Sequence, residues 1–559
     1  MPRLIECVPN FSEGRDQGVI DQITAAIESV TGATLLDVDP GRATHRTVVT
    51  FVGEPEPVIE AAVQAALKAG ELIDMAQHSG EHPRFGALDV CPLVPISGVS
   101  MEECAEYART LARRLGEEAG LTVYCYENAA LRPARQDLAA VRAGEYEGLE
   151  ARLADPEWAP DFGPAVFQSR TGATAVGARD FLVAYNVNLN TTSARRANAV
   201  AFDVREKGRV LRAPDPLTGE IVHDEAGQPV WKPGSLKCVK GIGWYIEEYG
   251  VAQISMNLTN ISVTPTHVAF DECCERARDR GLRVTGSEIV GLVPLEAMLS
   301  AGRHYLRRQQ RSLGVPDDEL IRVAVLSMGL NDLTPFVPEE KIIERIIEAK
   351  AAVGGRLRLV DRTLSGFTQE TASESPAPGG GSVAAAVGAL GAALGTMVAN
   401  LSAHKRGWDE RWEEFSKWAE RGQQHFSELL ELVDRDTQAF EAVMAAWRAD
   451  PSEREQAVQH ATRGAIAVPL RVMEVSVASF EVLEAMAKSG LPASLSDAGV
   501  GALCARTAVL SAELNVRINA PGITDEDERA ALLGQAAELR ETALRREREV
   551  LALVDEKLD

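Results

Sequence analysis

The sequence predicts two α/β lobes with mixed sheets, followed by an all-α helical-bundle domain. Strand-like and helix-like segments alternate through the first part of the chain, which indicates α/β architecture. Beyond residue 355 no convincing strand-like segment occurs, and apolar residues recur at helical spacing. We therefore expect an N-terminal lobe at residues 1–162, a second lobe at 163–340, a linker helix and linker at 341–358, and a helical domain at 359–559. A length of 559 residues fits this division.

Each lobe is expected to contain its own strands and helices. In the first lobe, Ile20, Ile23, Ile27 and Val30 follow helical spacing, and Pro55 stands where prolines open helices. Over both lobes and the linker we expect strands at 4–8, 34–39, 46–52, 90–96, 121–126, 181–190, 236–247 and 252–258, and helices at 19–30, 55–73, 101–118, 193–209, 266–280 and 341–352.

Two further segments have an unusual composition. Residues 213–234 are rich in Pro, Gly and acids, which predicts a solvent-facing insertion. The apolar run Val383–Val398 is too short for a membrane span and consists mostly of Ala and Gly, so we interpret it as a packed helix. Pro469 is expected to kink or split its helix. The helical domain should contain helices at 359–370, 382–401, 409–444, 453–486, 500–518 and 525–556.

Composition excludes several classes of function. The net charge of −24 argues against binding to nucleic acid or to an anionic membrane surface, since both require a basic face. The eight cysteines are scattered, without metal-binding spacing or a disulfide framework, so we expect no metal and a reducing cytoplasm. The N-terminus has no signal-peptide layout.

One polar loop, Gln77 to Val90, concentrates groups suited to proton transfer. It holds two histidines, two acids and an arginine, and Pro83 and glycines prevent a long helix. Histidine can both take and give a proton near pH 7. His78 and His82 could be surface or capping residues, but the position of His82 between Glu81 and Arg84 favours function.

The helical part offers a binding motif and two candidate acids. Gly379, Gly380, Gly381 and Ser382 precede a helix of small residues, where free N–H groups suit a carboxylate or phosphate. A flexible cap on a packed helix explains the same residues. Further on, Asp436 falls inside an apolar helical stripe and Asp434 lies off it, so we favour Asp436 and keep Asp434 as second choice. A buried ion pair of Asp436 with Arg471 is the simpler alternative.

Two other segments carry weaker signals. Asp37 and Asp39 alternate at the end of a strand beside His45 and Arg46, where strand-end capping explains them. The segment Gly163 to Gly172 is a loop between lobes, which is a common place for a ligand cleft.

Together these segments resemble the formimidoyltransferase-cyclodeaminase family, bifunctional folate enzymes of histidine degradation. The resemblance covers nearly the whole chain. Its carriers are Cys7-Val8-Pro9-Asn10-Phe11-Ser12-Glu13-Gly14, His78-Ser79-Gly80-Glu81-His82-Pro83-Arg84-Phe85-Gly86, Gly172-Ala173-Thr174, Gly177-Ala178-Arg179, Gly241-Ile242-Gly243-Trp244-Tyr245, Val290-Gly291-Leu292-Val293-Pro294 and Pro378-Gly379-Gly380-Gly381-Ser382-Val383-Ala384-Ala385.

The resemblance implies two reactions with tetrahydrofolate as co-substrate and no metal. The α/β half would move the formimino group of N-formimidoyl-L-glutamate to tetrahydrofolate, and the helical half would cyclise the product to 5,10-methenyltetrahydrofolate with release of ammonia. It also implies a homo-oligomer, with polyglutamylated folate as substrate.

The resemblance also implies roles for individual residues. The transferase histidine falls on His82, and the cyclodeaminase aspartate falls within Asp434 to Asp436. Asn10, Asp39 and Arg84 are expected to contact substrate in the first site, with Asp39 near the amidinium and Arg84 on a carboxylate. In the second site this role falls on Gly379, Gly380, Gly381 and Ser382. The folate loop falls on Gly163-Pro164-Ala165-Val166-Phe167-Gln168-Ser169-Arg170-Thr171-Gly172.

Two alternatives remain open for the helical half. It could act like a methenyltetrahydrofolate cyclohydrolase, with water as reactant and no ammonia formed. It could also be a non-catalytic assembly domain fused to an active transferase.

Overall fold

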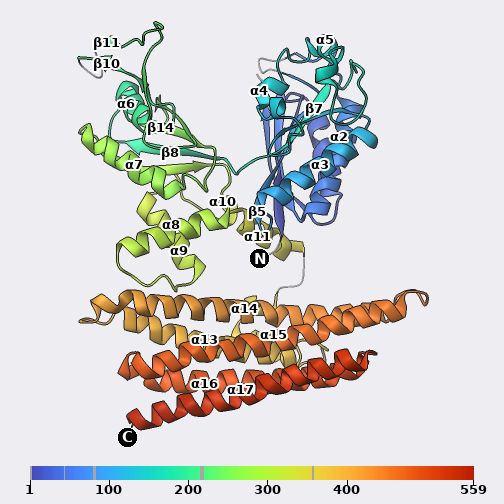
Figure 1. Cartoon of the computed structure of the whole chain (residues 1–559), viewed down its shortest axis with the longest axis vertical. Helices are drawn as coiled ribbons and strands as arrows, with labels where there is room; N and C mark the ends of the chain where they lie inside the picture. Colours follow the sequence, from blue (N-terminus) through green and yellow to red (C-terminus); the bar gives the residue numbers. More distant parts are fainter. Residues whose placement is uncertain (1–2, 43–44, 80–83, 215–218, 355–357, 559) are drawn as a thin grey trace. The chain divides into compact units, whose positions relative to one another are not determined.

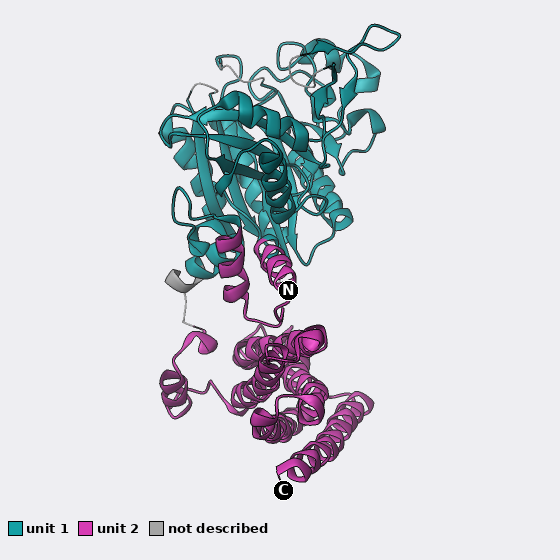
Figure 2. Cartoon of the chain, turned by 90° about the vertical axis from the view of Figure 1, so that its left-hand side faces the viewer, with its two compact units in different colours: residues 1–297, 328–350 teal, residues 298–327, 351–559 magenta. Residues whose placement is uncertain are grey.

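Two large β-sheets, two small two-stranded sheets and a long helical region make up the described fold (Figure 1), which confirms the predicted fold class. This computed structural model describes residues 3–42, 45–79, 84–214, 219–354 and 358–558. The chain divides into two units (Figure 2): Met1–Ala297 with Met328–Lys350, and Met298–Ser327 with Ala351–Asp559.

The first lobe is built on a mixed sheet in the order β1-β4-β2-β5-β7-β6, with β3 paired to β4. β7 lies between β5 and β6 and is parallel to both. The first sheet therefore continues to residue 178, past the expected lobe boundary at 162. The boundary was placed too early because a parallel strand is reached only through a long crossover, which leaves no local pattern in the sequence. The strands are β1 (Leu4–Cys7), β2 (Asn10–Phe11), β3 (Ala33–Gly41), β4 (Arg46–Gly53), β5 (Leu88–Ser97), β6 (Thr122–Glu127) and β7 (Ala173–Ala178).

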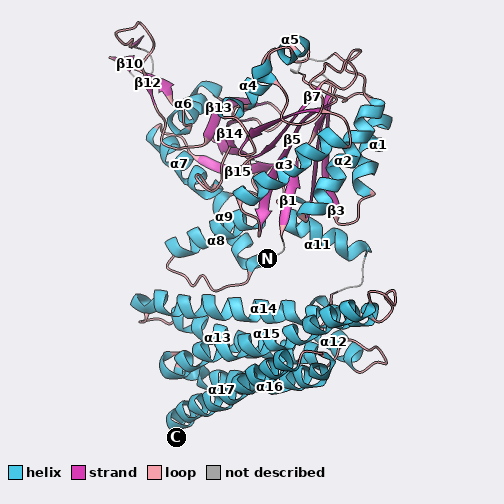
Figure 3. Ribbon diagram, turned by 45° about the vertical axis from the view of Figure 1, so that its right-hand side comes forward, coloured by secondary structure: helices cyan, strands magenta, loops and turns pink. Residues whose placement is uncertain are grey.

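Helices cover the first sheet (Figure 3), and alternation along each strand builds a core on either face. In β6, Val123 and Cys125 join the core formed with α1, α2 and α3. Tyr124 and Tyr126 point the other way and pack with Phe85 and Leu149. The helices are α1 (Gln17–Glu28), α2 (Pro55–Leu72), α3 (Met101–Glu117), α4 (Leu138–Val141) and α5 (Leu149–Leu153), with 3₁₀ turns η1 (Pro133–Arg135) and η2 (Pro156–Trp158).

The second lobe contains an antiparallel sheet in the order β13-β14-β8-β15, packed against α6 and α7. The amide of Asn198 on α6 donates to the carbonyl of Gly243 at 2.8 Å and accepts from its N–H at 2.9 Å, which fixes the helix on β13. α6 ends at Val204, earlier than expected, since the backbone of Arg205 is already extended, with a φ of −62° and a ψ of 146°. These elements are β8 (Val183–Leu189), β13 (Val239–Ile246), β14 (Val251–Leu258), β15 (Val284–Val290), α6 (Ala194–Val204) and α7 (Thr266–Asp279).

The insertion after α6 forms small two-stranded pairs that extend away from the sheet (Figure 1). β12 pairs with β9, which places Trp231 opposite Val210, and β10 pairs with β11. These strands are β9 (Arg209–Val210), β10 (Arg212–Ala213), β11 (Glu220–Ile221) and β12 (Trp231–Lys232).

Two helices of the predicted second lobe, α8 (Leu295–Arg308) and α9 (Asp317–Met328), belong largely to the helical unit. The turn between them packs on the bundle: the N–H of Leu313 donates to Ser416 Oγ at 3.0 Å, and Asn400 Nδ2 donates to the carbonyl of Gly314 at 2.7 Å. Neither α8 nor α9 was predicted from the sequence. The connection onward is α10 (Pro338–Lys341) and α11 (Ile343–Gly354).

Long helices form the rest of the helical unit, and α13 packs against α14, α15 and α16. α13 is long and apolar enough to cross a membrane, but 61% of its most apolar window is buried inside the unit, as in the core helix of a bundle. The helix predicted at 359–370 is divided into a 3₁₀ turn and a short helix. The elements are η3 (Leu359–Asp361), α12 (Leu364–Thr371), α13 (Gly380–Ala403), α14 (Trp412–Ala446), α15 (Arg454–Ser489), α16 (Leu495–Asn519) and α17 (Glu526–Leu558), with η4 (Asp409–Arg411), η5 (Pro492–Ser494) and η6 (Ala520–Gly522) between them.

Pro469 does not split its helix. α15 runs through it from Arg454 to Ser489. Proline removes the N–H that would bind the carbonyl four residues earlier. That carbonyl, on Ala465, accepts a hydrogen bond from Asn519 Nδ2 at 3.0 Å instead.

Candidate active sites

A buried carboxylate organises the candidate site of the first lobe. Asp89 on β5 is 1% exposed and accepts from two arginines, Arg46 on β4 and Arg142, the second at 2.9 Å. Its other oxygen accepts from the N–H of Phe85 at 2.8 Å. Arg46 also donates to the amide oxygen of Asn10 at 2.9 Å. Since both oxygens are hydrogen-bonded and two cations balance the charge, this group holds β2, β4 and β5 together.

Two histidines stack beside this group. The rings of His45 and His78 lie 4.2 Å apart at an angle of 11°. His45 Nε2 lies 3.1 Å from Glu13 Oε1, and its Nδ1 lies 2.9 Å from the carbonyl oxygen of Ser79. Both neighbours only accept hydrogen bonds, so both bonds form together only when His45 carries two protons. His45 is also in the left-handed region, with a φ of 51°.

Glu13 is held in the ionised form that such a partner requires. Burial raises the pKa of its carboxyl, but the N–H groups of Asp16, Arg15 and Gly14 and the charge of His45 lower it further than burial raises it. The backbone donors lie 2.7 to 3.0 Å from Oε1. The result is a fixed carboxylate beside the ring of His45.

The surroundings of His78, unlike those of Glu13, favour the neutral form of the side chain. Burial lowers the pKa of its imidazole, and the charges of His45 and Arg84 act in the same direction. Its Nε2 lies 2.8 Å from the carbonyl oxygen of His45, which places the proton on Nε2. Among the described residues its buried Nδ1 has no hydrogen-bond partner. His78 is therefore a neutral imidazole with a free basic nitrogen.

Arg84 anchors the other end of the polar loop. It donates to the carbonyls of Met75 and His78 and to the carboxylate of Glu147, with 3.1 Å from Nε to Glu147 Oε1. Its guanidinium lies 5.0 Å from the ring centroid of Tyr146. Holding a substrate carboxylate, the expected role of Arg84, would require exchanging the contact with Glu147.

The predicted folate loop lies against this same anchor. The hydroxyl of Tyr146 donates to the carbonyl of Ser169 at 2.5 Å, and its ring lies 5.5 Å from that of Phe167. The N–H of Ala87 donates to the carbonyl of Thr171 at 2.9 Å. The structure thus brings the 163–172 loop and the Gln77 to Val90 loop together. From the sequence they were interpreted as separate motifs.

The other predicted residues of this site are placed as follows. His82 lies outside the described residues, but Ser79 and Arg84, on either side of its segment, are both fixed by the contacts above. Asn10 donates to the carbonyl of Val8 at 2.9 Å and accepts from Arg46. Asp39 is exposed on β3, opposite Val48.

The second candidate site is in the helical unit, where Asp436 on α14 meets the beginning of α13. The N–H and the hydroxyl of Ser382 donate to its Oδ2 at 2.8 and 3.0 Å. A Cβ on Gly381 would lie only 2.1 Å from Oδ1, so this approach requires glycine there. Burial raises the pKa of Asp436, although the hydrogen bonds from Ser382 oppose that effect.

Asp434 faces a different neighbour. Its oxygens accept from the N–H groups of Leu359 and Val360 at 2.7 and 3.4 Å, which caps the turn η3. The suggested ion pair between Asp436 and Arg471 is absent from the described residues, because Arg471 binds Glu428 and Glu474 instead. The two acids therefore have different surroundings. Asp434 caps the backbone of η3, whereas Asp436 lies against the glycine-rich start of α13.

The group around Asp89 and the stacking of the two histidines were not predicted from the sequence. Asp89 was noted only as one of the two acids of the polar loop, and Arg142 was not noted, because the partners are far apart in the sequence. His45 and Arg46 were noted only as neighbours of Asp37 and Asp39. Their position at the start of a predicted strand was the available signal.

Known proteins are similar to this chain over most of its length. Residues 4–179 match the family described as the formiminotransferase domain, N-terminal subdomain, residues 184–348 match the formiminotransferase domain, and residues 363–538 match formiminotransferase-cyclodeaminase. The formimidoyltransferase-cyclodeaminase of Mus musculus is 44% identical over 532 residues, 94% of each chain. The chain belongs to the formimidoyltransferase-cyclodeaminase family. The resemblance predicted from the motifs is confirmed, and with it the prediction of an enzyme.

Separate relatives match each half of this family member. The glutamate formimidoyltransferase of Streptococcus pyogenes serotype M1 is 39% identical over 307 residues, which is 55% of this chain and 94% of that protein. The methenyltetrahydrofolate cyclohydrolase of Methylorubrum extorquens is 34% identical over 194 residues, which is 32% of this chain and 93% of that protein. Each of these two proteins is thus matched over nearly its whole length by a part of this chain.

Proposed function

We propose that the chain catalyses two consecutive reactions on tetrahydrofolate. The α/β lobes transfer the formimino group of N-formimidoyl-L-glutamate to N5 of tetrahydrofolate. The helical domain then closes 5-formimidoyltetrahydrofolate to 5,10-methenyltetrahydrofolate and releases ammonia. The observation that carries the second step is Asp436, a partly buried carboxylate with a raised pKa at a helix start lined by glycines.

The first reaction needs a group that both removes and supplies a proton. N5 loses a proton when it attacks the amidine carbon, and the departing glutamate nitrogen gains one. We assign this exchange to His82, whose segment is anchored at Ser79 by His45 and at Arg84 by Glu147. The stacked ring of His78 and the contact between His45 and Glu13 hold these anchors in place. Asn10, Asp39, Arg84 and the 163–172 loop are the proposed binding residues.

The second reaction needs proton transfer between two nitrogens of one substrate. N10 attacks the formimino carbon and loses a proton, and the former imino nitrogen leaves as ammonia. Asp436 suits this transfer, because burial moves the pKa of its carboxyl toward neutrality. The absence of a side chain at Gly381 lets the carboxylate approach the start of α13, and Ser382 fixes its orientation.

A coupled assay tests this proposal. Purified protein is mixed with N-formimidoyl-L-glutamate and tetrahydrofolate, and glutamate, ammonia and methenyltetrahydrofolate absorbance are followed together. We expect all three products from the wild type, none from His82→Ala, and glutamate alone from Asp436→Asn. Glutamate without ammonia from the wild type would refute the cyclodeaminase step, and no glutamate would refute the transferase.

A cyclohydrolase-like helical domain is the second candidate, favoured by the likeness to the Methylorubrum extorquens protein. The two candidates differ in the substrate that the domain accepts. Ammonia released from supplied 5-formimidoyltetrahydrofolate supports the cyclodeaminase. Hydrolysis of methenyltetrahydrofolate without that activity supports the cyclohydrolase.

We further propose a homo-oligomer in a reducing compartment such as the cytoplasm. Exposed apolar side chains recur on one face of α13 and one face of α16, which is typical of surfaces buried between subunits. Free cysteines, among them the buried Cys7, Cys91 and Cys125, fit a reducing environment. The exposed apolar residues are Leu390, Met397, Leu401, Val500, Leu503, Leu514 and Ile518.

A further inference from the structure

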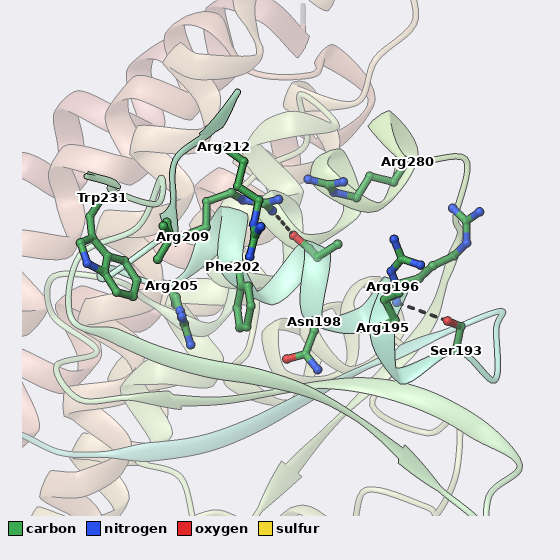
Figure 4. A pocket seen from close by; sticks show the side chains of 12 residues that line it. Ser193, Arg195, Arg196, Asn198, Phe202, Arg205, Arg209, Arg212, Trp231 and Arg280 are labelled. Atoms are coloured by element: carbon green, nitrogen blue, oxygen red, sulfur yellow. Dashed lines mark hydrogen bonds between the residues drawn. The ribbon is translucent and has the colours of Figure 1, made fainter. Parts of the chain in front are cut away.

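A cavity of about 810 Å³ in the second lobe is lined by arginines. It lies between α6 and the insertion strands, and Figure 4 shows the arginine side chains around the helix with Trp231 at one side. All its lining residues fall between Ser193 and Arg280, so neither the 163–172 loop nor Asp436 contributes to it. Its arginines are Arg195, Arg196, Arg205, Arg209, Arg212 and Arg280.

The positive charge of this arginine cavity is only partly balanced. The described lining residues include no acid, and Asp203 pairs with Arg209 and with Arg280, at 2.8 Å from Arg280 Nε. Arg205 and Arg212 donate to carbonyl oxygens, which carry no charge. Such an excess of cations is unexpected by chance in a chain with a net charge of −24.

Two arginines on the open side of the cavity have no partner at all within the described part of the chain. Arg195 and Arg196 are exposed in the first turn of α6, and neither guanidinium has a hydrogen bond or ion pair there. The more buried members repel one another: burial lowers the pKa of Arg205, and the charge of Arg209 lowers it further. A bound anion would pair with Arg195 and Arg196 and would reduce the repulsion between Arg205 and Arg209.

The cavity is built from fixed elements. Asn198 holds α6 on β13, and the pairing of β9 with β12 holds Trp231 beside the helix. Trp231 is 41% exposed and lies next to the guanidinium groups, and Lys207 Nζ lies 4.5 Å from the centroid of its ring. Guanidinium groups bind carboxylate and phosphate through paired hydrogen bonds, and the volume is within the range of small-molecule sites.

We propose that the arginine cavity binds a small molecule that carries two or more phosphate or carboxylate groups. The site is separate from both candidate active sites and does not depend on either reaction. Inorganic triphosphate, ATP and a linear triglutamate peptide distinguish the sources of the anion, since they differ in charged group and in the presence of a ring.

Calorimetric titration of the full-length protein with each probe, at 50 mM and 200 mM salt, tests the proposal. The test variant is Arg195→Gln with Arg196→Gln, because neither exposed guanidinium binds another of the residues that the structure describes. The matched control is Arg278→Gln with Arg283→Gln, two exposed arginines of the same lobe that do not line the cavity. Both variants lose the same charge.

We expect at least one probe to bind the wild type and the control alike, more weakly at high salt, and about tenfold more weakly to the test variant. Preference for triphosphate and ATP identifies phosphate as the ligand group, and preference for triglutamate identifies carboxylate. Tighter binding of ATP than of triphosphate assigns the ring to Trp231. Equal weakening in both double variants, or no binding of any probe, overturns the proposal. A change of oligomeric state in the test variant without anion binding also overturns it, and assigns the arginines to a contact between copies of the chain.

Discussion

Asp89 and Asp436 are both carboxylates withdrawn from water, but their surroundings differ in kind. Asp89 has two arginines and a backbone N–H on its oxygens. Asp436 has hydrogen bonds from Ser382 and no cation among the described residues. A buried acid with full charge compensation stabilises structure, whereas one without it has a raised pKa and can exchange a proton. The partners of a buried acid, rather than its burial, indicate its role.

The largest expected effect is on the activity of the helical domain. Asp436→Asn keeps the size of the side chain and an oxygen for Ser382 but removes the titrating group. We expect ammonia release from 5-formimidoyltetrahydrofolate to fall about a hundred- to ten-thousand-fold, with formimino transfer to tetrahydrofolate unchanged. Steady-state rates of both half-reactions provide the measurement. Retained ammonia release would place the cyclodeaminase acid elsewhere and end the contrast with Asp89.

Asp89→Asn should act on stability instead. Removing one member of a buried, hydrogen-bonded ion group leaves the others uncompensated, at a cost of about 3–5 kcal/mol. Arg46 and Arg142 would both lose their shared carboxylate. We expect faster hydrogen exchange in β4 and β5, measured by mass spectrometry, with the helices α13 to α16 as the internal reference.

A catalytic rather than structural Asp89 would give the reverse pattern. Exchange in β4 and β5 would then match the wild type while formimino transfer is lost. That outcome would show that a fully compensated acid can still carry chemistry in this protein.

Asp434→Ala separates the two acids of α14. The change removes the acceptor for the N–H groups of Leu359 and Val360, and leaving such a group unpaired costs about 1–2 kcal/mol. We expect a lower urea midpoint for the helical domain, with ammonia release within about twofold of the wild type at low temperature. Loss of activity in a stably folded Asp434→Ala protein would instead reverse the assignment between Asp434 and Asp436.

The sequence predicted the elements that carry a local pattern. Helices with a continuous apolar stripe, such as α2 and α3, lie close to their expected ranges. β7 was missed as a strand of the first sheet because Ala173–Ala178 has small side chains and its partners, β5 and β6, are reached only by a long crossover. The pattern also failed for Phe440 and Trp447, which continue the stripe of Asp436 but are exposed.

The residues of the candidate sites were predictable from the sequence only where a single motif contained them. The glycines of residues 379–381 and the acid pair of α14 were both found, but their meeting at Ser382 follows from helix packing. The group of Arg46, Asp89 and Arg142 joins three distant segments, and no local pattern predicts it. The choice between Asp434 and Asp436 likewise required the backbone of Leu359, which lies about 75 residues away.

The smallest expected effect is a pH-dependent gain of stability in Asp436→Asn. Because burial raises the pKa of Asp436 in the folded protein above its unfolded value, the folded state binds the proton more tightly. The stability from this group is complete below the unfolded pKa and is lost as pH rises through the folded pKa. Asparagine has no charge to bury, so Asp436→Asn should be more stable than the wild type at pH 8, and the difference should vanish toward pH 4. Urea midpoints of both proteins across this range measure it. A difference that is constant with pH would mean that the Asp436 carboxylate is compensated in the folded protein, as Asp89 is, and the contrast between the two sites would fail.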